Sequence, residues 1–536
     1  MLLILSGEYV QTELASEFGR IPPCFLPVGN RRLYTYQLAR LANQYERVNM
    51  TLPANYDVDS IDFASLDAAG VTIFRTAEGI SLGAAALTVL AESRHEGRID
   101  ILFGDTFVTE PLPRNSDWLA IGESDENYRW HHERRTAGLA DKVWVGMFSF
   151  SNAVALRRLL ASGLSFIEAI EAYSSSVHAL ELVNVRGWLD FGHVHTYFAS
   201  KRHITTQRHF NDIAVEDGVL RKTSGDSRKI LAEASWFEKA PASVRAFLPN
   251  LIEVRRSEQS FYALEYLPLA ALNELYVFGC LPEKVWAKIF RACDTFFTAA
   301  GKIVVPAEAR LDRQELEALY RGKTLSRLEK FGAESGVSLH ETWTFNGDPV
   351  PSLIDIAEEA SNAVLDSTRH VSAFVHGDFC FSNVLFDFRG GKVKLIDPRG
   401  LNSSGGDTIF GDFRYEVAKL AHSVVGLYDF IVAGRCEGKF DGRKIRFELP
   451  LQATQGVRDV FMSTPFRGRV PAQWDCYPIM VLLFLSMLPL HADDPRRQAG
   501  LMSNALRLYV EWKNDRDTHG RQQQPILQGR LHTAQI

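Results

Sequence analysis

One stretch in the last third of the chain constrains its fold more than any other. Val375-His376-Gly377-Asp378 follows an apolar segment, Asn383 stands five positions after Asp378, and Val393 to Ile396 leads into Asp397. Phosphoryl transfer from ATP requires a carboxylate that accepts the proton of the attacking hydroxyl, and oxygen ligands that hold Mg²⁺ on the phosphates. The stretch predicts catalytic residues at Asp378 and His376, with Asp378 as the base, and metal ligands at Asn383 and Asp397.

A purely structural interpretation of the same residues is the alternative. His376 and Asp378 would then cap turns, and Asn383 would begin a strand. On composition alone, three fixed residues at this spacing arise in roughly one chain in thirty of this length. The flanking apolar strands and the terminal Asp397 argue against coincidence, so we favour the functional interpretation.

These motifs resemble the aminoglycoside phosphotransferase and choline kinase superfamily, a branch of the protein-kinase-like fold, over about residues 204–515. The resemblance implies ATP as phosphate donor, Mg²⁺, and a small lobe with further ATP contacts. Lys222 is similar to the strand lysine that contacts the phosphates, and Glu233 to its partner on the following helix. Glu265 and Tyr266 are similar to the hinge, whose backbone holds adenine.

The sequence departs from that pattern at two places. No G-x-G-x-x-G loop precedes Lys222, which fits small-molecule kinases better than protein kinases. Asp397 is followed by Pro398-Arg399-Gly400 instead of Phe-Gly; Arg399 is either a contact to a phosphate or anionic substrate, or an exposed structural arginine. This D-P-R-G segment resembles that of kinases encoded with polysaccharide-assembly genes. The resemblance implies a sugar-like or polyol hydroxyl as acceptor. Asp412, in the helix segment 411–419, is interpreted as a cap.

The first two hundred residues alternate apolar strand patterns with helical ones. Strands are predicted at residues 2–5, 47–52, 71–74 and 99–103, and helices at 33–43 and 82–93. This order predicts a Rossmann-like α/β domain with a mainly parallel sheet covered on both faces. Ligands of such sheets lie beyond the carboxyl ends of the strands, where Asp105 is expected.

Two aspartates of this region are candidate Mg²⁺ ligands for nucleotidyl transfer: Asp105 in Phe103-Gly104-Asp105, and Asp190 in Trp188-Leu189-Asp190-Phe191-Gly192. The order of segments resembles the sugar-phosphate nucleotidyltransferase family, a GT-A-like fold, across residues 1–203. The resemblance implies an NTP substrate (CTP, UTP or GTP), with Gly7 in the opening loop and Gly83 at the start of a helix as nucleotide contacts.

The same region lacks two cations that the family uses to bind the triphosphate. Gln11 stands near the place of the loop arginine, and Pro23 near that of the lysine. Arg20, Arg31 or Arg32 could compensate. We therefore keep two interpretations open, a nucleotidyltransferase and a domain that only binds a nucleotide or serves as a scaffold.

Composition limits the remaining possibilities. The 536 residues carry 59 basic and 65 acidic side chains, a net charge of -6, so no global positive field attracts nucleic acid. Six cysteines are scattered without a C-x-x-C pair, the opening residues 1–5 are too short for a signal peptide, and the longest apolar stretch, 477–490, falls short of the ~20 residues that span a bilayer. We expect a cytoplasmic protein without membrane insertion, and a buried helix at 477–490.

We expect two units, 1–203 and 204–536, the second with a small lobe (204–270), a large lobe (271–515) and a polar tail. Residues 128–135 are basic and aromatic, and a polar surface loop is preferred there to a phosphate or metal site. Residues 311–330 alternate charges as on a solvated helix face, which could lie over the acceptor site.

The whole sequence favours a bifunctional enzyme that phosphorylates a small hydroxyl compound and then activates the product as an NDP derivative for surface polysaccharide. Two alternatives remain. One is a kinase whose N-terminal unit is a non-catalytic binding module, and the other is a protein kinase or a catalytically dead regulator.

Overall fold

The computed structural model describes residues 1–536 except 125–130, 134–140, 206, 209–210, 258 and 523–536. The chain forms two compact units, each built from several segments. The first comprises Met1–Gly225, Ala263–Pro282 and Phe386–Gly390, and the second comprises Asp226–Tyr262, Glu283–Leu385 and Gly391–Ile536. The expected boundary near residue 203 stays a prediction.

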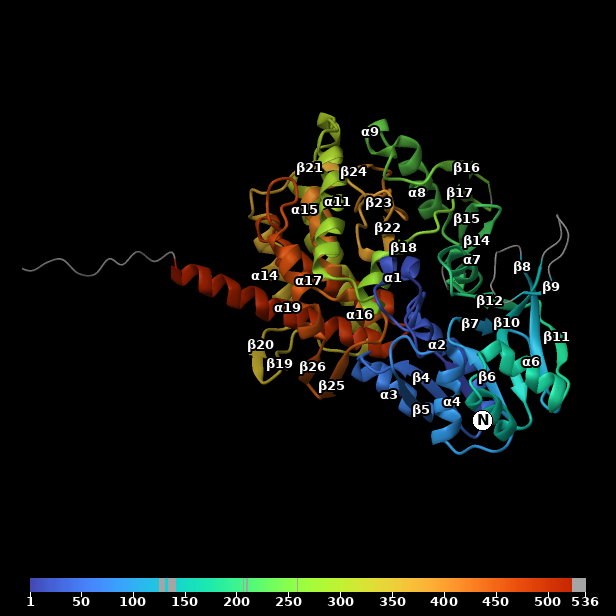
Figure 1. The fold of residues 1–536 in the computed structure, drawn as a ribbon. Helices are drawn as coiled ribbons and strands as arrows, with labels where there is room; N and C mark the ends of the chain where they lie inside the picture. The colour runs from blue at the N-terminus through green and yellow to red at the C-terminus, as the bar shows by residue number, and fades with distance from the viewer. Residues whose placement is uncertain (125–130, 134–140, 206, 209–210, 258, 523–536) are drawn as a thin grey trace, which may run out of the picture. The chain divides into compact units, whose positions relative to one another are not determined.

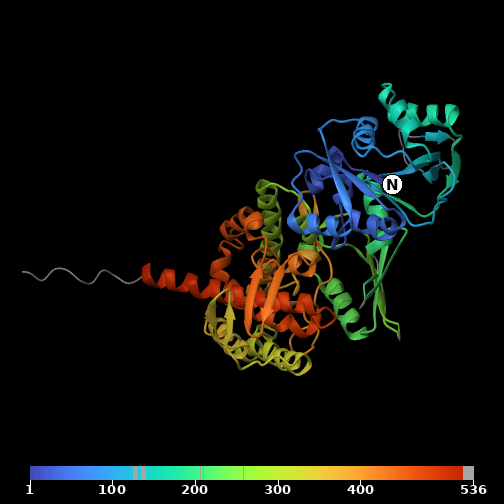
Figure 2. The same cartoon turned by 90° about the horizontal axis from the view of Figure 1, so that it is seen from below.

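An eight-stranded mixed sheet organises the first unit, in the order β11-β8-β10-β6-β1-β4-β5 with β9 paired to β10. Its strands are β1 (Leu2–Leu5), β4 (Val48–Pro53), β5 (Val71–Thr76), β6 (Ile99–Phe103), β8 (Trp118–Ser124), β9 (His131–Glu133), β10 (Asp141–Phe150) and β11 (Glu181–Asn184). Strands β6, β1, β4 and β5 run parallel, as predicted, whereas β10 is antiparallel to both of its main neighbours. Figure 2 shows these strands in blue to cyan.

Alternating side chains explain why this sheet is buried on both faces. The odd-numbered residues of β1 and β6, such as Leu3 and Ile101, pack with Phe148 of β10 against α4 (Leu82–Glu92), α5 (Ala153–Ala161) and α6 (Phe166–Ser176) (Figure 1). The residues between them, such as Ile4 and Leu102, are buried on the opposite face. The apolar runs therefore form central strands, as their composition predicts.

The other elements of this unit place the site residues. They are α1 (Thr12–Phe18), β2 (Pro27–Val28), β3 (Arg31–Arg32), α2 (Leu33–Leu41), α3 (Ser60–Ala68), β7 (Thr106–Val108), β12 (Trp188–Asp190), α7 (Val194–Thr205) and α10 (Leu272–Phe278). The predicted helices at 33–43 and 82–93 correspond to α2 and α4.

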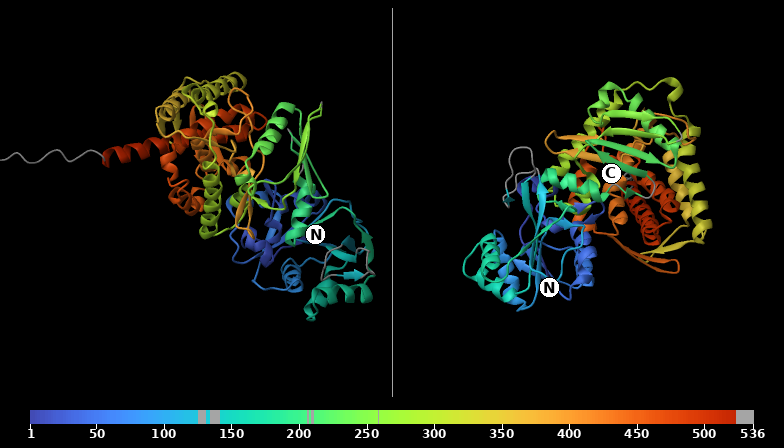
Figure 3. Two further views of the ribbon diagram at one scale, coloured as in Figure 1. Left: turned by 90° about the horizontal axis from the view of Figure 1, so that it is seen from above. Right: turned by 90° about the vertical axis from the view of Figure 1, so that its right-hand side faces the viewer.

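A hairpin follows residue 203. Strands β14 (Asn211–Glu216) and β15 (Val219–Ser224) are antiparallel, and the turn places Asp217 and Gly218 at positive φ, as a two-residue hairpin turn requires. A five-stranded sheet has the order β13-β14-β15-β17-β16, with β13 at Gln207–Arg208, β16 at Leu251–Arg255 and β17 at Phe261–Glu265 (green in the right-hand view of Figure 3).

Helices dominate the second unit. They are α8 (Ser227–Lys239), α9 (Ala242–Arg245), α11 (Glu283–Gly301), α12 (Arg313–Glu317), α13 (Lys323–Ser335), α14 (Leu353–Leu365), α15 (Phe413–Val424), α16 (Tyr428–Val432), α17 (Leu451–Ser463), α18 (Cys476–Met487) and α19 (Pro495–Gln522). The chain also has short strands after residue 269. Strand β18 (Ala270–Ala271) belongs to the first unit. The others lie between the helices: β19 (Trp343–Phe345), β20 (Asp348–Val350), β21 (Ser372–Phe374), β22 (Val384–Asp387), β23 (Lys392–Leu395), β24 (Phe410–Asp412), β25 (Glu437–Asp441) and β26 (Lys444–Glu448).

The apolar stretch 477–490 forms the centre of this helical body. Every residue of α18 from Pro478 to Ser486 is buried, and the helix packs against α13, α14, α15 and α19. A helix that is apolar all round needs such a complete shell of neighbours. Among the described helices, none combines the length and the hydropathy that crossing a membrane requires.

Candidate active sites

Backbone hydrogen bonds assemble the kinase-type loop after β21. The Ile396 N–H donates to the Asn383 carbonyl at 3.0 Å, and the Arg399 N–H donates to the His376 carbonyl at 2.9 Å. These two bonds join the segment around Asp397 to the loop that carries Asp378. The structure thus brings together the predicted base and both predicted metal ligands.

Asn383 also fixes the loop through its side chain. Its Nδ2 donates to the backbone carbonyl of Asp378 at 2.9 Å and to the carboxylate Oδ2 of the same residue at 3.0 Å. The amide oxygen of Asn383 accepts from Ser382 Oγ at 3.3 Å and has a second lone pair that can serve a cation. Asp397 adopts φ +57°, a left-handed conformation that non-glycine residues rarely take and that is found at functional sites.

The oxygen donors of Asn383 and Asp397 fit Mg²⁺, which prefers amide and carboxylate oxygens. When bound, Mg²⁺ would neutralise charge on the phosphates of ATP. No group of three or more His, Cys, Asp or Glu side chains suited to a metal occurs among the described residues. The candidate site therefore depends on this Asn–Asp pair together with substrate and water oxygens.

Asp378 forms an ion pair that the sequence does not predict. Lys419 of α15 places its Nζ 2.7 Å from Asp378 Oδ1. Burial alone would raise the pKa of Asp378, but Lys419 outweighs it and holds the pKa well below its usual range. About 39% of the Asp378 side chain stays exposed, so a charged carboxylate remains within reach of a substrate hydroxyl.

His376 is wholly buried, and the backbone engages both of its ring nitrogens. Nε2 lies 2.9 Å from the Ile396 carbonyl and must donate to it, while Nδ1 accepts from the Asp378 N–H at 3.3 Å. Burial lowers the pKa of His376 to about 4, which agrees with a neutral ring. This arrangement makes His376 a positioning residue that orients the Asp378 backbone, and the predicted catalytic role is narrowed accordingly.

Glu416 is a second loop anchor that the sequence does not reveal. Its carboxylate accepts from the N–H groups of His376 at 2.7 Å and Gly377 at 2.8 Å. Burial raises the pKa of Glu416 to about 7. Asp412 behaves as predicted: it caps α15 by accepting from the Arg414 N–H and pairs with the buried Arg414 guanidinium.

The four predicted ATP contacts lie on the expected elements. Lys222 lies on β15 and Glu233 on α8, and both side chains are buried. Glu233 accepts a hydrogen bond from Tyr262 at 2.8 Å. The pairing of Lys222 with Glu233 stays a prediction. Glu265 ends β17, and the Tyr266 N–H donates to the Gly218 carbonyl at 2.8 Å, so this N–H is not available to adenine.

In the first unit, strand pairing brings the two predicted metal aspartates together. Strand β12 pairs with β7 so that Asp190 lies opposite Thr106, the residue after Asp105, and the Phe191 N–H donates to the Asp105 carbonyl at 2.8 Å. A Cβ atom on Gly192 would lie 2.6 Å from Asp105 Oδ2 and 3.2 Å from Asp190 Oδ1. Both carboxylates therefore border one small space.

The electrostatics of this pair fit a divalent cation. Burial, and then the charge of Asp190, raise the pKa of Asp105. Asp190 itself accepts hydrogen bonds from the Gly192 N–H at 2.8 Å and Thr196 Oγ1 at 2.7 Å, and lies 3.1 Å from His193 Nδ1. Two like charges in a dry site are costly unless a cation neutralises them, and carboxylates are the ligands that Mg²⁺ prefers.

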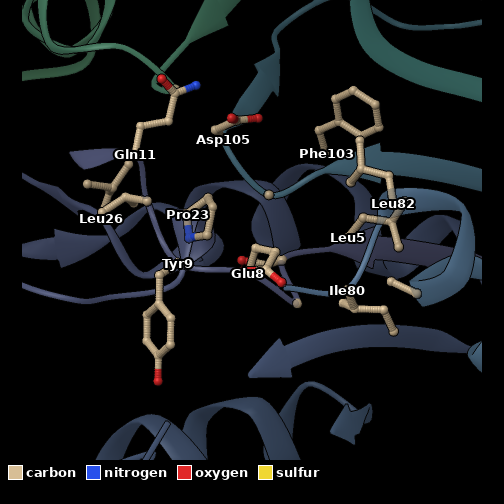
Figure 4. A pocket seen from close by; sticks show the side chains of 16 residues that line it. Leu5, Glu8, Tyr9, Gln11, Pro23, Leu26, Ile80, Leu82, Phe103 and Asp105 are labelled. Atoms are coloured by element: carbon tan, nitrogen blue, oxygen red, sulfur yellow. The ribbon is translucent and has the colours of Figure 1, made fainter. Parts of the chain in front are cut away.

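A cavity of about 280 Å³ adjoins Asp105 (Figure 4). The loop at Gly7 passes along it, and Gly7 is needed there because a Cβ would lie 2.5 Å from Thr76 Oγ1. Leu5, Ile80, Leu82 and Phe103 gather on one side of the cavity, and Gln11 lies on the other (Figure 4). Glu8 also lines the cavity, and its Oε1 is buried without a hydrogen-bond partner.

Gly83 does not belong to this lining. A Cβ atom on it would lie 3.3 Å from the Phe166 backbone nitrogen. Its absence of a side chain lets α4 pack closely against α6, so Gly83 has a packing role, and the nucleotide contact at Gly83 stays a prediction.

No lysine, arginine or histidine is among the described residues that line the cavity. Two of the three arginines proposed to compensate have other partners. Arg20 pairs with Glu78, and buried Arg32 pairs with Asp62 at 3.0 Å and donates to the Phe25 and Phe278 carbonyls. Arg31 is exposed. The predicted surface loop at 128–135 lies largely outside the described residues.

No protein-family model and no curated protein sequence matches this chain. Among solved structures, a putative glucose-1-phosphate thymidylyltransferase from Bacillus anthracis is 10% identical and covers 39% of this chain and 96% of its own, with a TM-score of 0.32. The inositol-1-phosphate CTP transferase from T. maritima is 9% identical and covers 36% of this chain and 90% of its own, with a TM-score of 0.28. An aminoglycoside-3'-phosphotransferase of type VIII is 16% identical and covers 52% of this chain and 95% of its own, with a TM-score of 0.31.

Proposed function

We propose that this chain is an ATP- and Mg²⁺-dependent kinase of a small hydroxyl compound. The observation that carries the proposal is the convergence of Asp378, Asn383 and Asp397, which two backbone hydrogen bonds bring into one loop cluster. Asp378 is charged and accessible, so it can orient the substrate hydroxyl and accept its proton. A sugar-like or polyol acceptor and a role in surface polysaccharide synthesis in the cytoplasm belong to the same proposal.

The test is ATP consumption by the full-length protein with a panel of sugars, polyols and amino alcohols. Asp378→Asn should lower turnover of the best acceptor by about 10²–10⁴-fold, because it removes the general base. Equilibrium ATP binding and the unfolding temperature of the variant show whether it still folds. Unchanged turnover in Asp378→Asn would contradict the kinase proposal, and phosphorylation of proteins alone would favour the protein kinase alternative.

A second activity, nucleotidyl transfer by the first unit, is favoured by the shared space between Asp105 and Asp190. The phosphorylated product would be joined to CTP, UTP or GTP with release of pyrophosphate. Fusing consecutive steps in one chain raises the effective concentration of the intermediate. Without a cation in the described lining of the cavity, Mg²⁺ would have to neutralise most of the charge of the triphosphate.

Pyrophosphate release decides between this activity and a binding module. The protein is incubated with Mg²⁺, each NTP and the phosphorylated products of its own kinase reaction. Nucleotidyl transfer is supported if the wild-type protein releases pyrophosphate and the Asp105→Asn variant does not. Nucleotide binding without release from any substrate pair supports the non-catalytic module.

A further inference from the structure

Four cations lie close to Tyr415 of α15 or to the proposed base of the kinase site; we call Lys323, Arg327, Arg399 and Lys419 the basic cluster. Lys323 and Arg327 lie one turn apart on α13, Lys419 lies on α15, and Arg399 follows Pro398 after Asp397. Lys419 contacts Asp378 at 2.7 Å. Residues 311–330 are predicted to form a solvated helix face. Lys323 in this segment is half-buried, so the face does not contact water alone.

Tyr415 connects the members of the cluster. Its hydroxyl accepts a hydrogen bond from Lys323 Nζ at 3.1 Å, and its ring lies 5.3 Å from the same nitrogen. Tyr415 and Arg399 both line a cavity next to His376 and Gly377. The Arg399 backbone is fixed at the wall, because the Arg399 N–H donates to the His376 carbonyl and its Cβ lies against Gly377.

Too few carboxylates pair with the basic cluster to neutralise its positive charge. Within the described part of the chain, no ion pair joins Lys323, Arg327 or Arg399 to a carboxylate, and Asp378 pairs with Lys419 alone. Arg327 donates to the Ser486 carbonyl at 3.1 Å, which satisfies one N–H and leaves its charge uncompensated. Burial and repulsion from Arg399 and Arg327 lower the pKa of Lys323 to about 8.

The carboxylates of the cavity wall are engaged elsewhere. Glu416 accepts from the His376 and Gly377 N–H groups, and Glu315 accepts from the Asp312 N–H at the start of α12. Asp412 is paired with Arg414. None of these three carboxylates forms an ion pair with the cluster among the described contacts.

We propose that the acceptor of this kinase is an anionic hydroxyl compound, and that Lys323, Arg327 and Arg399 bind its carboxylate or phosphate group while Asp378 faces its hydroxyl. The proposal rests on the proposed kinase function and specifies its substrate class. Like charges held together in a half-buried site gain most from a bound anion, and guanidinium groups suit carboxylate and phosphate geometry.

The phosphates of ATP are the competing occupant of this cluster. Lys419 contacts Asp378 at 2.7 Å, and Lys323 contacts Tyr415, which lies four residues before Lys419 on α15. The cluster is therefore linked by direct contacts to the base, which faces the acceptor. Kinetics can separate the two occupants, because each substrate has its own KM.

The first experiment compares matched acceptors with the full-length protein, ATP and Mg²⁺: glycerol, glycerol 3-phosphate and glycerate, and sugars beside their uronic acids and phosphates. We expect kcat/KM at least about tenfold higher for the anionic member of a matched pair than for the neutral one. Preference for the phosphate over the carboxylate identifies the anion. Equal or better use of neutral acceptors across the panel overturns the proposal.

The second experiment changes the cluster. Lys323→Met should raise the KM of the best anionic acceptor about tenfold or more, while the KM of ATP stays the same. Lys330→Met is the matched control, because Lys330 lies on the same helix, is exposed and pairs with Glu334. A rise in the KM of ATP alone would assign the cluster to the nucleotide and overturn the proposal.

Binding measurements separate failure of this inference from failure of the kinase proposal. Calorimetric titration of glycerol 3-phosphate and of the best anionic compound into Asp378→Asn, with and without Lys323→Met, reads out the anion site without turnover. Lys323-dependent binding in a protein that phosphorylates nothing supports the anion site and refutes the kinase. Phosphorylation of neutral compounds without Lys323-dependent binding refutes the anion site and leaves the kinase standing.

Discussion

At the scale of single residues, the pairing of Asp378 with Lys419 decides whether the site holds a charged base. A half-buried carboxylate without a counter-ion tends to take up a proton, and Lys419 opposes this at 2.7 Å. The same lysine adds to the basic cluster. Lys419 stands eight residues after Gly411, and no motif there predicts its contact with Asp378.

We predict that Lys419→Met lowers kcat by about 10²-fold, because the charge and orientation of the general base both depend on this pair. Lys419→Arg keeps a cation and should retain most of the lost activity. Steady-state kinetics with the best acceptor measures both variants. Equal kcat values in wild type and Lys419→Met would show that the ion pair is dispensable for catalysis.

His376 permits a prediction about pH. Its folded pKa of about 4 lies below its ordinary value of 6.5, so between these values the unfolded chain binds a proton that the folded chain does not. The stabilisation from neutral His376 is complete above pH 6.5 and is lost as the pH falls toward 4. We expect the stability advantage of wild type over His376→Gln to narrow by up to about 3 kcal/mol across this window.

Denaturant unfolding of the two proteins between pH 7 and 4 measures that difference. The titration of the imidazole by NMR, assigned by its loss in His376→Gln, checks the cause. A His376 ring that titrates near pH 6.5 would contradict both the burial and the tautomer described above.

At the scale of elements, the loop after β1 is confined by its neighbours. Gly7 lies between Thr51 and Thr76, and the Thr76 hydroxyl donates to the Gly7 carbonyl at 3.0 Å. A side chain at position 7 must displace this threonine from its hydrogen bond. The glycine of the loop thus serves close packing as well as any contact with a nucleotide.

We predict that Gly7→Ala lowers the free energy of unfolding of the first unit by about 1–3 kcal/mol through overpacking. Gly225→Ala is the control, since nothing lies within 4 Å of a Cβ there. Calorimetric unfolding of both variants tests the difference. If Gly7→Ala and Gly225→Ala shift the unfolding transition by similar amounts, the contact with Thr76 is relieved with little loss of folding free energy.

At the scale of the whole molecule, two acidic centres occupy two compact units, and each is assembled from residues of its own unit. Their chemistry should therefore be separable by mutation. Asp378→Asn should abolish phosphorylation and leave pyrophosphate release from a supplied phosphorylated substrate intact. Asp105→Asn should abolish pyrophosphate release and leave phosphorylation intact.

We further predict that Asp105→Asn leaves the unfolding temperature unchanged or raises it without Mg²⁺, because it removes one of two like charges in a buried site. The stabilisation of the first unit by added Mg²⁺ should then disappear. Calorimetry with EDTA and with excess Mg²⁺ measures this. Equal Mg²⁺ stabilisation of wild type and variant would place the cation elsewhere.

Much of the fold follows from local patterns. The strands at β1, β4, β5 and β6 and the helix α4 were predictable because apolar runs and helical spacing reflect burial of nearby residues. The reversed direction of β10 was not, since strand direction depends on pairing partners far away in the sequence. The packing of Gly83 against α6 was not predictable for the same reason, because α6 lies far from it in the chain.

The order of amino acids specifies the chemical groups of this protein: a base, an amide and an acid spaced for phosphoryl transfer, and two aspartates at strand ends. Which of its charges meet depends on the tertiary structure. Lys419 reaches Asp378, Lys323 reaches Tyr415, and Arg32 is turned away from the first site toward Asp62. Charge interactions fall with distance through space, and sequence patterns report only on distance along the chain.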